Sequence, residues 1–254
     1  PHPSYLGIYQ EIPPDVSAVA SMATRRSILA FGLVRKYKNL ERLLIDLDPD
    51  FTRQYDLHIT ISGATLPGDN YRETLTARAA GRTDVTLDFR HVPQEEVAGA
   101  MESAGCVILP YERFLTSGAA LLAMSFGKII IGPSTPQFLE ILPKSSHRYL
   151  YREGDREDIK RAVVDVLGMS EDEHRLVVAD LLDRAAYFSP QRISEQLGQV
   201  LDTLVGRQRK KLDQAAAKRA SPQPRPSHSS PEKTAAPKKR KYGFLRELYR
   251  KAIK

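Results

Sequence analysis

Three cations follow closely on the glycine that ends the first apolar run of the chain. The run ends at Gly32, and the next six residues hold Arg35, Lys36 and Lys38. Guanidinium and ammonium groups gathered in this way form charge-assisted hydrogen bonds to the oxygens of a diphosphate. Cations at the start of a helix oppose its dipole, and a bound anion would offset that cost. The segment therefore predicts a phosphate site, with an ordinary solvated surface as the alternative.

A helix start rich in small residues follows a later apolar run, at residues 106–109. Thr116 or Ser117 is placed to cap a helix over residues 117–126, and Gly118 keeps its first turn free of bulk. Exposed backbone N–H groups at such a start bind phosphate readily. A plain cap on a closely packed helix explains the same residues, so both interpretations stay open.

The other candidate functional residues occur alone, without a neighbouring residue of complementary chemistry. Glu140 comes soon after the apolar run 129–131, and His91 follows another such run; a lone glutamate or histidine is usually a surface residue. The single cysteine, Cys106, lies among apolar residues and is expected to be a small buried hydrophobe. No cluster has the spacing of metal ligands, so no bound metal is expected.

Short β-branched runs alternate with segments of helical period, which is typical of a parallel sheet with crossover helices. The expected strands are residues 28–33, 57–62, 85–89, 106–109, 128–131 and about 148–151, and the expected helices are 39–48, 69–80, 94–104, 117–126, 156–167, 171–186 and 190–204. The fold class is therefore α/β, a doubly wound, Rossmann-like parallel sheet followed by C-terminal helices. In such sheets ligands bind at the carboxyl ends of the strands, where the three segments above begin.

Charge divides the chain into two parts. The formal net charge is +7, but residues 206–254 hold 16 Lys+Arg against 3 Asp+Glu, a net of +13, which leaves −6 for residues 1–205. A nucleic-acid-binding domain would carry its basic excess on the folded body, so no nucleic acid partner is expected. No segment has the roughly 18 to 20 consecutive apolar residues that span a bilayer, and no signal peptide opens the chain, so a cytoplasmic protein is expected.

The composition also predicts the domain boundaries. Residues 1–26 resemble a linker and entry helix leaving an N-terminal domain that is missing, and residues 27–205 form the folded domain. Residues 206–240, rich in Pro, Ser and Lys towards their end, are expected to be a disordered linker, and residues 241–254 a basic amphipathic helix. That tail fits attachment to an anionic membrane surface, which would make the protein peripheral at the inner face of the membrane. A nuclear import or nucleic-acid signal and a plain solubilising tail are the alternatives.

Order and spacing together carry a family resemblance. The run "ILAFGLVRKYKNLERLL", then "LHITISG", then "VILPY" and "LTSGAALLAMSFGK" resemble the C-terminal, donor-binding domain of family 4 glycosyltransferases, which have the GT-B fold. The resemblance covers roughly residues 1–205. It implies hexosyl transfer, with retention of anomeric configuration, from a nucleotide diphosphate sugar to an acceptor glycan or lipid-linked sugar, in polysaccharide or glycoconjugate synthesis. It implies no tightly bound cofactor, and it implies that this half alone is inactive.

The resemblance gives the cationic segment a role. Gly32 and Lys38 match the family's glycine and basic residue, so Lys38 is expected to neutralise the donor pyrophosphate. The usual arginine beside that glycine is Leu33 here, and Arg35 is expected to substitute for it. Glu140 matches a glutamate after the next strand. Lys38, Arg35 and Glu140 are therefore the expected catalytic residues.

Further positions follow from the same resemblance. Thr116, Ser117 and Gly118 match a Thr-Ser-Gly form of the phosphate-binding loop, and His91 and Val92 fall in the segment that borders the nucleobase.

This sequence also departs from the family. The paired glutamates of many members fall near Phe114 and on Leu122, and Gly105 stands where an aspartate is common. A leucine cannot accept a hydrogen bond from a ribose hydroxyl. One alternative is therefore a non-catalytic nucleotide-binding or scaffold module with a partner-recruiting tail. Another is an enzyme of a different class, such as a nucleotide-sugar epimerase.

Overall fold

The computed structural model describes residues 26–66, 68–111, 114 and 117–220. The chain divides into a unit of residues 1–203 and a unit of residues 204–254. The predictions for the tail, residues 241–254, and for nearly all of the entry segment, residues 1–26, concern residues outside the described part of the chain.

Six parallel strands form the centre of the first unit. They are β1 (Ser27–Phe31), β2 (His58–Ser62), β3 (Val85–Asp88), β4 (Cys106–Ile108), β5 (Ile129–Pro133) and β6 (Leu150–Tyr151). Their order in space is β3-β2-β1-β4-β5-β6, and Leu29 of β1 pairs with Thr60 on one side and Val107 on the other. This is the doubly wound order in which the chain turns from one half of the sheet to the other between β1 and β4, as the sequence predicts.

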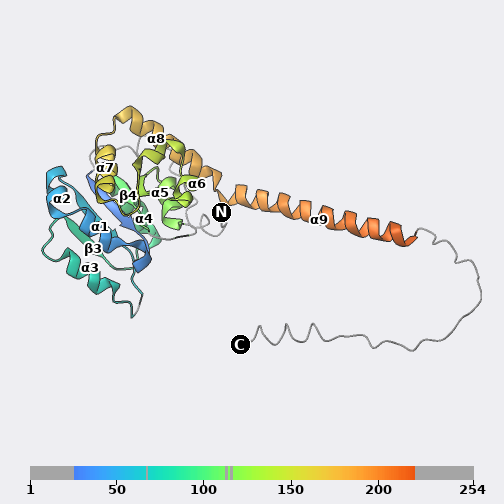
Figure 1. Ribbon diagram of the computed structural model, residues 1–254, viewed down its shortest axis with the longest axis horizontal. Helices are drawn as coiled ribbons and strands as arrows, with labels where there is room; N and C mark the ends of the chain where they lie inside the picture. The colour runs from blue at the N-terminus through green and yellow to red at the C-terminus, as the bar shows by residue number, and fades with distance from the viewer. Residues whose placement is uncertain (1–25, 67, 112–113, 115–116, 221–254) are drawn as a thin grey trace, which may run out of the picture. The chain divides into compact units, whose positions relative to one another are not determined.

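Helices lie on both faces of this sheet (Figure 1). The described helices are η3 (Lys36–Lys38), α1 (Leu40–Asp46), α2 (Pro49–Tyr55), α3 (Tyr71–Ala79), α4 (Gln94–Ser103), α5 (Gly118–Ser125), α6 (Pro136–Ile141), η4 (Lys144–Tyr149), α7 (Arg156–Leu167), α8 (Glu171–Tyr187) and α9 (Pro190–Ala220). The sheet grows in opposite directions from β1 and from β4, and right-handed crossovers therefore place α1 and α3 on one face and α5 on the other. The packing agrees, since α1 contacts α3 and α7 while α5 contacts α8.

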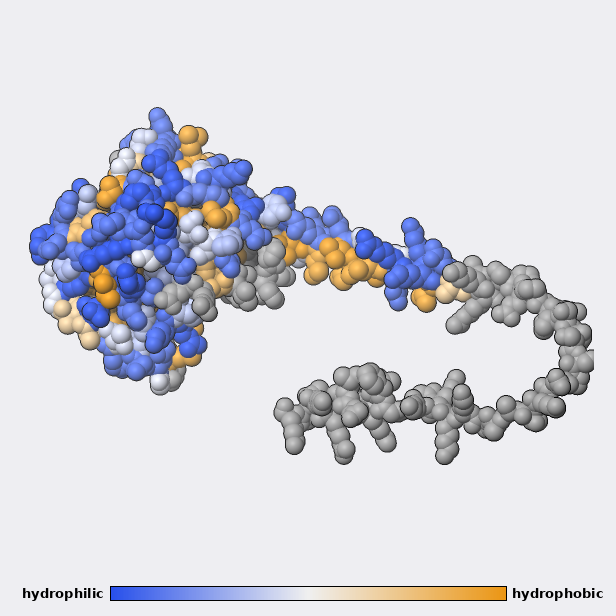
Figure 2. All heavy atoms as spheres, in the orientation of Figure 1, coloured by the Kyte–Doolittle hydropathy of each residue, from blue (hydrophilic) through white to orange (hydrophobic). Residues whose placement is uncertain are grey.

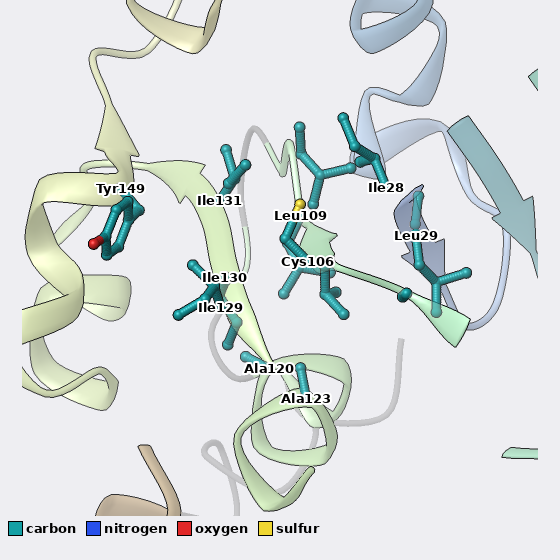
Figure 3. Packing of buried hydrophobic residues seen from close by; sticks show 14 of the residues in the cluster. Ile28, Leu29, Cys106, Leu109, Ala120, Ala123, Ile129, Ile130, Ile131 and Tyr149 are labelled. Carbon is teal, nitrogen blue, oxygen red and sulfur yellow. The ribbon is translucent and has the colours of Figure 1, made fainter. Parts of the chain in front are cut away.

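The core lies around β4 and β5. Ile129, Ile130 and Ile131 are fully buried, and Figure 3 shows them among the side chains of Cys106, Ala123 and other buried residues. Burial on both faces explains why this strand carries no polar residue. Cys106 is 1% exposed, which confirms the expectation of a small buried hydrophobe, and its burial raises the pKa of the thiol to about 12.

Two short α-helices, α2 and α6, were not predicted, and neither were the 3-10 helices η3 and η4, the second of which covers the start of the strand expected at about residues 148–151. Asp48 begins α2 by accepting hydrogen bonds from the N–H groups of Asp50 and Phe51, and Thr135 begins α6 in the same manner. Both starts carry a cap followed by proline, which is a recognised helix signal. The helices are only seven and six residues long, too short for an apolar period to become visible.

The last described helix corrects one boundary. A helix over residues 190–204 and a disordered linker from residue 206 were expected, but α9 continues to Ala220, so residues 206–220 are helical. This segment is rich in Arg, Lys, Gln and Ala, which favour helix without any apolar period. The expectation relied on periodicity alone, and for this segment it was wrong.

Half-exposed apolar side chains lie along one side of α9, where Figure 2 shows them in orange. They are Leu197, Val200, Leu201, Leu204, Val205 and Leu212. Among the described residues, no helix combines the length and the apolar character needed to cross a bilayer.

Candidate functional site

Two glycines bring the ends of β1 and β2 into contact. The N–H of Gly32 donates to the carbonyl of Ser62 at 2.9 Å, and both Gly32 and Gly63 have positive φ angles, +98° and +148°. A β-carbon on Gly63 would stand 2.2 Å from the carbonyl oxygen of Gly32, closer than any real contact. Only glycine therefore fits at Gly63, and the two strand ends form one shared edge.

Lys38 is the buried cation of this edge. The short helix η3 turns the chain back after β1, and the side chain of Lys38 returns towards Gly32 with only 6% of the residue exposed. Its ammonium donates a long hydrogen bond, 3.4 Å, to the carbonyl of Phe31 and lies 5.3 Å from the centre of the Tyr111 ring. Within the described part of the chain, no carboxylate pairs with it.

Burial has a measurable electrostatic effect on this lysine. Desolvation lowers the pKa of the Lys38 ammonium to about 8. A buried charge without a counter-ion is costly, and an anionic ligand would remove that cost. A perturbed lysine beside a glycine turn at the strand ends is therefore a candidate binding group with a stated physical reason.

The other two cations of the segment, Arg35 and Lys36, are not buried beside Gly32 as Lys38 is. The carbonyl of Arg35 accepts from the N–H of Lys38 at 3.0 Å, which closes the turn, and its half-buried side chain forms no hydrogen bond or ion pair with a described residue. Lys36 is exposed. Of the three predicted cations, the structure brings only Lys38 into the interior beside Gly32.

The start of α5 supplies backbone donors at the end of β4. Ser117 is buried, and its hydroxyl accepts a hydrogen bond from the N–H of Ala120 at 3.1 Å. The first hydrogen bond within the helix runs from Leu121 to the carbonyl of Ser117, so the N–H groups of Gly118 and Ala119 precede it. Both residues are half-exposed, and N–H groups at a helix start are suited to an anion. Thr116 lies outside the described residues.

The two residues expected at the nucleobase line a cavity with the glycine turn. His91 and Val92 follow β3, and together with Gly32, Leu33 and Gly63 they border a space of about 360 Å³. The structure thus places the ends of three neighbouring strands around one cavity, beside Lys38.

Glu140 is not part of this cavity. It is exposed at the end of α6, and its carbonyl accepts from the guanidinium of Arg184. Its carboxylate forms no hydrogen bond or ion pair with any described residue. Leu122, where a family glutamate was aligned, is 1% exposed in the core, so a carboxylate there would be buried without a partner.

The sequence analysis did not identify two residues of the candidate site, Tyr111 and Gly63. Tyr111 is buried, and its ring contacts both Lys38 and the rings of Tyr37 and Phe114, at centroid distances of 6.0 and 5.3 Å. Gly63 provides the second turn. Each stands just beyond an apolar run, as Gly32 does, and that position is the signal that could have revealed them.

A comparison with known families decides the assignment. Residues 25–169 match the model of the family described as Glycosyl transferases group 1. This chain belongs to that family. Among glycosyl transferase relatives, the GDP-mannose:glycolipid 4-beta-D-mannosyltransferase of Xanthomonas campestris pv. campestris is 29% identical over 106 residues, which cover 42% of this chain and 30% of that protein.

Solved structures of glycosyl transferases share the fold. A structure from E. coli described as trehalose-6-phosphate bound with UDP-2-fluoro glucose superposes with a TM-score of 0.61 at 15% identity, covering 79% of this chain and 50% of that chain. The sucrose-phosphate synthase of Thermosynechococcus elongatus gives a TM-score of 0.58 at 18% identity, covering 76% and 49%. The C-terminal domain of the group 1 protein LpcC from Francisella tularensis gives 0.51 at 17% identity, covering 63% and 84%. This glycosyl transferase chain therefore has the Rossmann-like fold of one half of a GT-B enzyme, and it spans about half the length of the first two structures.

Proposed function

We propose that this chain is the donor-binding half of a retaining hexosyltransferase that takes a nucleotide diphosphate sugar and serves polysaccharide or glycoconjugate synthesis. Its sugar would pass to a glycan or to a lipid-linked sugar. The observation that carries the proposal is the ammonium of Lys38, buried beside Gly32 with no carboxylate to neutralise it among the described residues. The names of similar proteins support the donor class, since they include GDP-mannose, UDP-2-fluoro glucose and UDP.

The chemistry would rest on electrostatic stabilisation of the leaving group. As the glycosidic bond breaks, the nucleoside diphosphate gains negative charge, and fixed donors stabilise that charge in the transition state. Lys38 supplies a positive charge, and the N–H groups of Gly118 and Ala119 supply dipoles. The guanidinium of Arg35, which has no partner among the described residues, would be the second cation of the proposed site. Glu140 is kept as a proposed catalytic residue on the family resemblance.

The nucleobase would occupy the cavity bordered by His91 and Val92. This cavity adjoins Gly32, so a nucleotide whose base lies there would place its diphosphate towards Lys38. The proposal needs no tightly bound cofactor, because the donor is a substrate that enters and leaves in each cycle.

Calorimetry with a matched pair of variants tests the proposal. Lys38→Met keeps the length of the side chain and removes its charge, while Lys36→Met removes an exposed neighbouring charge. We expect UDP or GDP to bind the wild-type chain and the Lys36 variant alike, and the Lys38 variant at least about tenfold more weakly. The base alone should bind all three chains equally. Absence of binding by UDP, GDP and their sugar derivatives to the full-length protein would contradict the proposal.

A non-catalytic nucleotide-binding module is the second candidate. It is favoured by Leu122, which lies in the core where many family members carry a glutamate. Sugar transfer by the full-length protein, abolished by Lys38→Met with folding intact, would exclude this candidate. A new sugar formed from the donor with no acceptor present would instead indicate an epimerase.

The stereochemistry needs its own measurement. The relative from Xanthomonas campestris is named for a β-linked product, whereas retention from an α-linked donor gives an α-linked product. Proton NMR of the fresh product of the full-length enzyme reads the anomeric configuration directly. An inverted product would overturn retention and leave the donor-binding function standing.

Attachment to an anionic membrane surface is proposed for the tail. The sequence of residues 238–254 combines eight Lys+Arg with one Glu, and each cation near an anionic leaflet adds about 1 kcal/mol of attraction. We expect the full chain to co-sediment with vesicles containing anionic lipid, and a chain ending at residue 237 to stay in solution. Equal sedimentation of both would end the membrane proposal.

A further inference from the structure

A cluster of four aromatic rings joins the two halves of the sheet at the strand ends. Tyr37 belongs to η3, which follows β1, whereas Tyr111 and Phe114 follow β4 and Phe138 belongs to α6. Tyr111 contacts the other three rings, and the centroid distances are 6.0 Å to Tyr37, 5.3 Å to Phe114 and 6.3 Å to Phe138. Tyr111 is 4% exposed and forms the centre of this cluster.

The ring of Tyr111 borders the buried charge that follows β1. Its centre lies 5.3 Å from the ammonium of Lys38. A cation within about 6 Å of an aromatic ring centre is attracted by the electrons of the ring face. The hydrogen bond from this ammonium to the carbonyl of Phe31 measures 3.4 Å, which is long for such a bond. The ring therefore helps to hold the ammonium in the interior, because that hydrogen bond alone is weak.

The phenol group of the same residue reaches the helix start that follows β4. It is hydrogen-bonded to the hydroxyl of Ser117, which caps α5 by accepting from the N–H of Ala120 at 3.1 Å. Ser117 is only 2% exposed, and a hydrogen bond in such a buried place is stronger than one in water. A bond that fixes Ser117 also fixes the first turn of α5, where the N–H groups of Gly118 and Ala119 lie.

We propose that Tyr111 is a positioning residue that ties the ammonium of Lys38 to the start of α5, so that both face the same diphosphate. One side chain contacts both groups, through its ring and through its hydroxyl. Two donor groups held in a fixed relation bind one ligand better than two that move independently, because less conformational freedom is lost on binding. The inference rests on the proposed diphosphate site for its purpose, but the positioning itself can be measured without a ligand.

The first test titrates Lys38 in the free 254-residue chain by NMR of ¹³C-labelled lysine, with Lys38→Met identifying the signal. Tyr111→Leu removes the ring and keeps an apolar side chain, and Tyr111→Met is the second ring deletion if the leucine variant does not fold. Tyr111→Phe keeps the ring and removes only the hydroxyl. Tyr149→Phe is the control, because that phenol is also fully buried but belongs to η4 and bonds to Glu173 at 3.2 Å.

The titration should separate the ring from the hydroxyl. Burial of the ammonium sets the pKa of Lys38 at about 8 in the wild-type chain. Without the ring, the ammonium should turn towards water, and its pKa should rise to about 9 or above, whereas Tyr111→Phe and Tyr149→Phe should leave it unchanged. A pKa that stays near 8 without the ring would overturn the positioning role. A wild-type pKa near the ordinary 10.5 would also overturn it, because the ammonium would then not be held in the interior.

Calorimetry with UDP and GDP tests what the positioning achieves. Tyr111→Phe should weaken binding about two- to fivefold through the lost bond to Ser117, and Tyr149→Phe should not weaken it. Tyr111→Leu should weaken binding about tenfold or more in the wild-type background. In the Lys38→Met background it should weaken binding only as much as Tyr111→Phe does, because the ring acts through the ammonium.

Two results lead to different conclusions. An equal loss of affinity from Tyr111→Leu in both backgrounds would overturn the positioning role and make Tyr111 a packing residue. If neither nucleotide binds the wild-type chain, the proposed function fails, and the titration of Lys38 still decides whether Tyr111 holds the ammonium.

Discussion

The ammonium of Lys38 lies 3.2 Å from the point at which a β-carbon would stand on Gly32. The absence of a side chain at Gly32 is therefore what leaves room for the buried charge. Glycine serves two purposes here, since its φ of +98° is also one that other residues adopt only with strain.

Replacing Gly32 by alanine should harm ligand binding more than folding. The positive φ costs about 1–2 kcal/mol of stability, and the added methyl group pushes the ammonium of Lys38 away from its position. Gly81→Ala is the control, because Gly81 has φ +76° with open space around the missing side chain. Both variants should lose similar stability in urea unfolding, while only Gly32→Ala loses nucleoside diphosphate affinity. Equal affinity in both would contradict the role given to Lys38.

The affinity for nucleoside diphosphates should depend on pH through Lys38. Its pKa in the free protein is about 8, so raising the pH above 8 removes the charge that attracts the anion. We expect the dissociation constant to rise up to about tenfold per pH unit above 8, until the pKa of the complex is passed. Calorimetry between pH 7 and 9.5 measures this. In Lys38→Met the slope should vanish, and a slope that survives would assign it to another group.

Lys38 should also make the stability of the fold depend on pH: the free energy of unfolding should rise with pH, whereas the affinity for nucleoside diphosphates falls. The folded pKa of Lys38, about 8, lies below the ordinary value of 10.5, so the unfolded chain binds more protons in this window. The cost of burying the charge is fully present below pH 8 and is relieved as the pH rises towards 10.5. Lys38→Met should therefore be more stable than wild type at pH 7, with the difference shrinking as the pH rises. Urea unfolding at pH 7 and 9.5 compares the two.

Asp48 should hold α2 against α7. Its carboxylate caps α2 through the N–H of Phe51 and bonds to Arg156 and Lys160 of α7. The backbone hydrogen bond from Phe51 is the main cause of the lowered pKa of this carboxyl, so its stabilisation is present above the ordinary pKa and is lost as the pH falls.

Asp48→Ala should lower the free energy of unfolding by about 2 kcal/mol at pH 7, by somewhat less at pH 3, and by progressively less as the pH falls further. Asp50→Ala, in the same helix but exposed, provides the comparison and should change stability little. If the two variants behave alike, the link between α2 and α7 does not stabilise the fold.

The sheet could be predicted because its signals are local. β-branched runs such as 129–131 must be buried on both faces, and the order of the strand-end loops carried the resemblance to the family. The site could be predicted in part, since Gly32, His91 and Val92 all follow strands. The sequence does not show which way a side chain points once the chain is folded. The family resemblance singled out Lys38, but nothing in the residue types separates it from Lys36, and the turn through η3, closed by the left-handed Asn39, is what buries it.

The sequence analysis also failed to predict the contact between Lys38 and Tyr111 and the full length of α9. The partnership of Lys38 with Tyr111 joins residues far apart in the chain, and no spacing rule connects them. The extent of α9 was missed because its last turns owe their helical form to residue propensity rather than to an apolar face.

The depressed pKa of Lys38 also makes it a nucleophile. At pH 7.5 roughly a quarter of its side chains carry a neutral amine, against about a thousandth for an ordinary surface lysine. A small uncharged aldehyde should therefore condense with the neutral amine of Lys38 to form an imine, with loss of water, in preference to lysines of ordinary pKa. A bound nucleotide would shield the amine, so the rate of modification reports occupancy of the site.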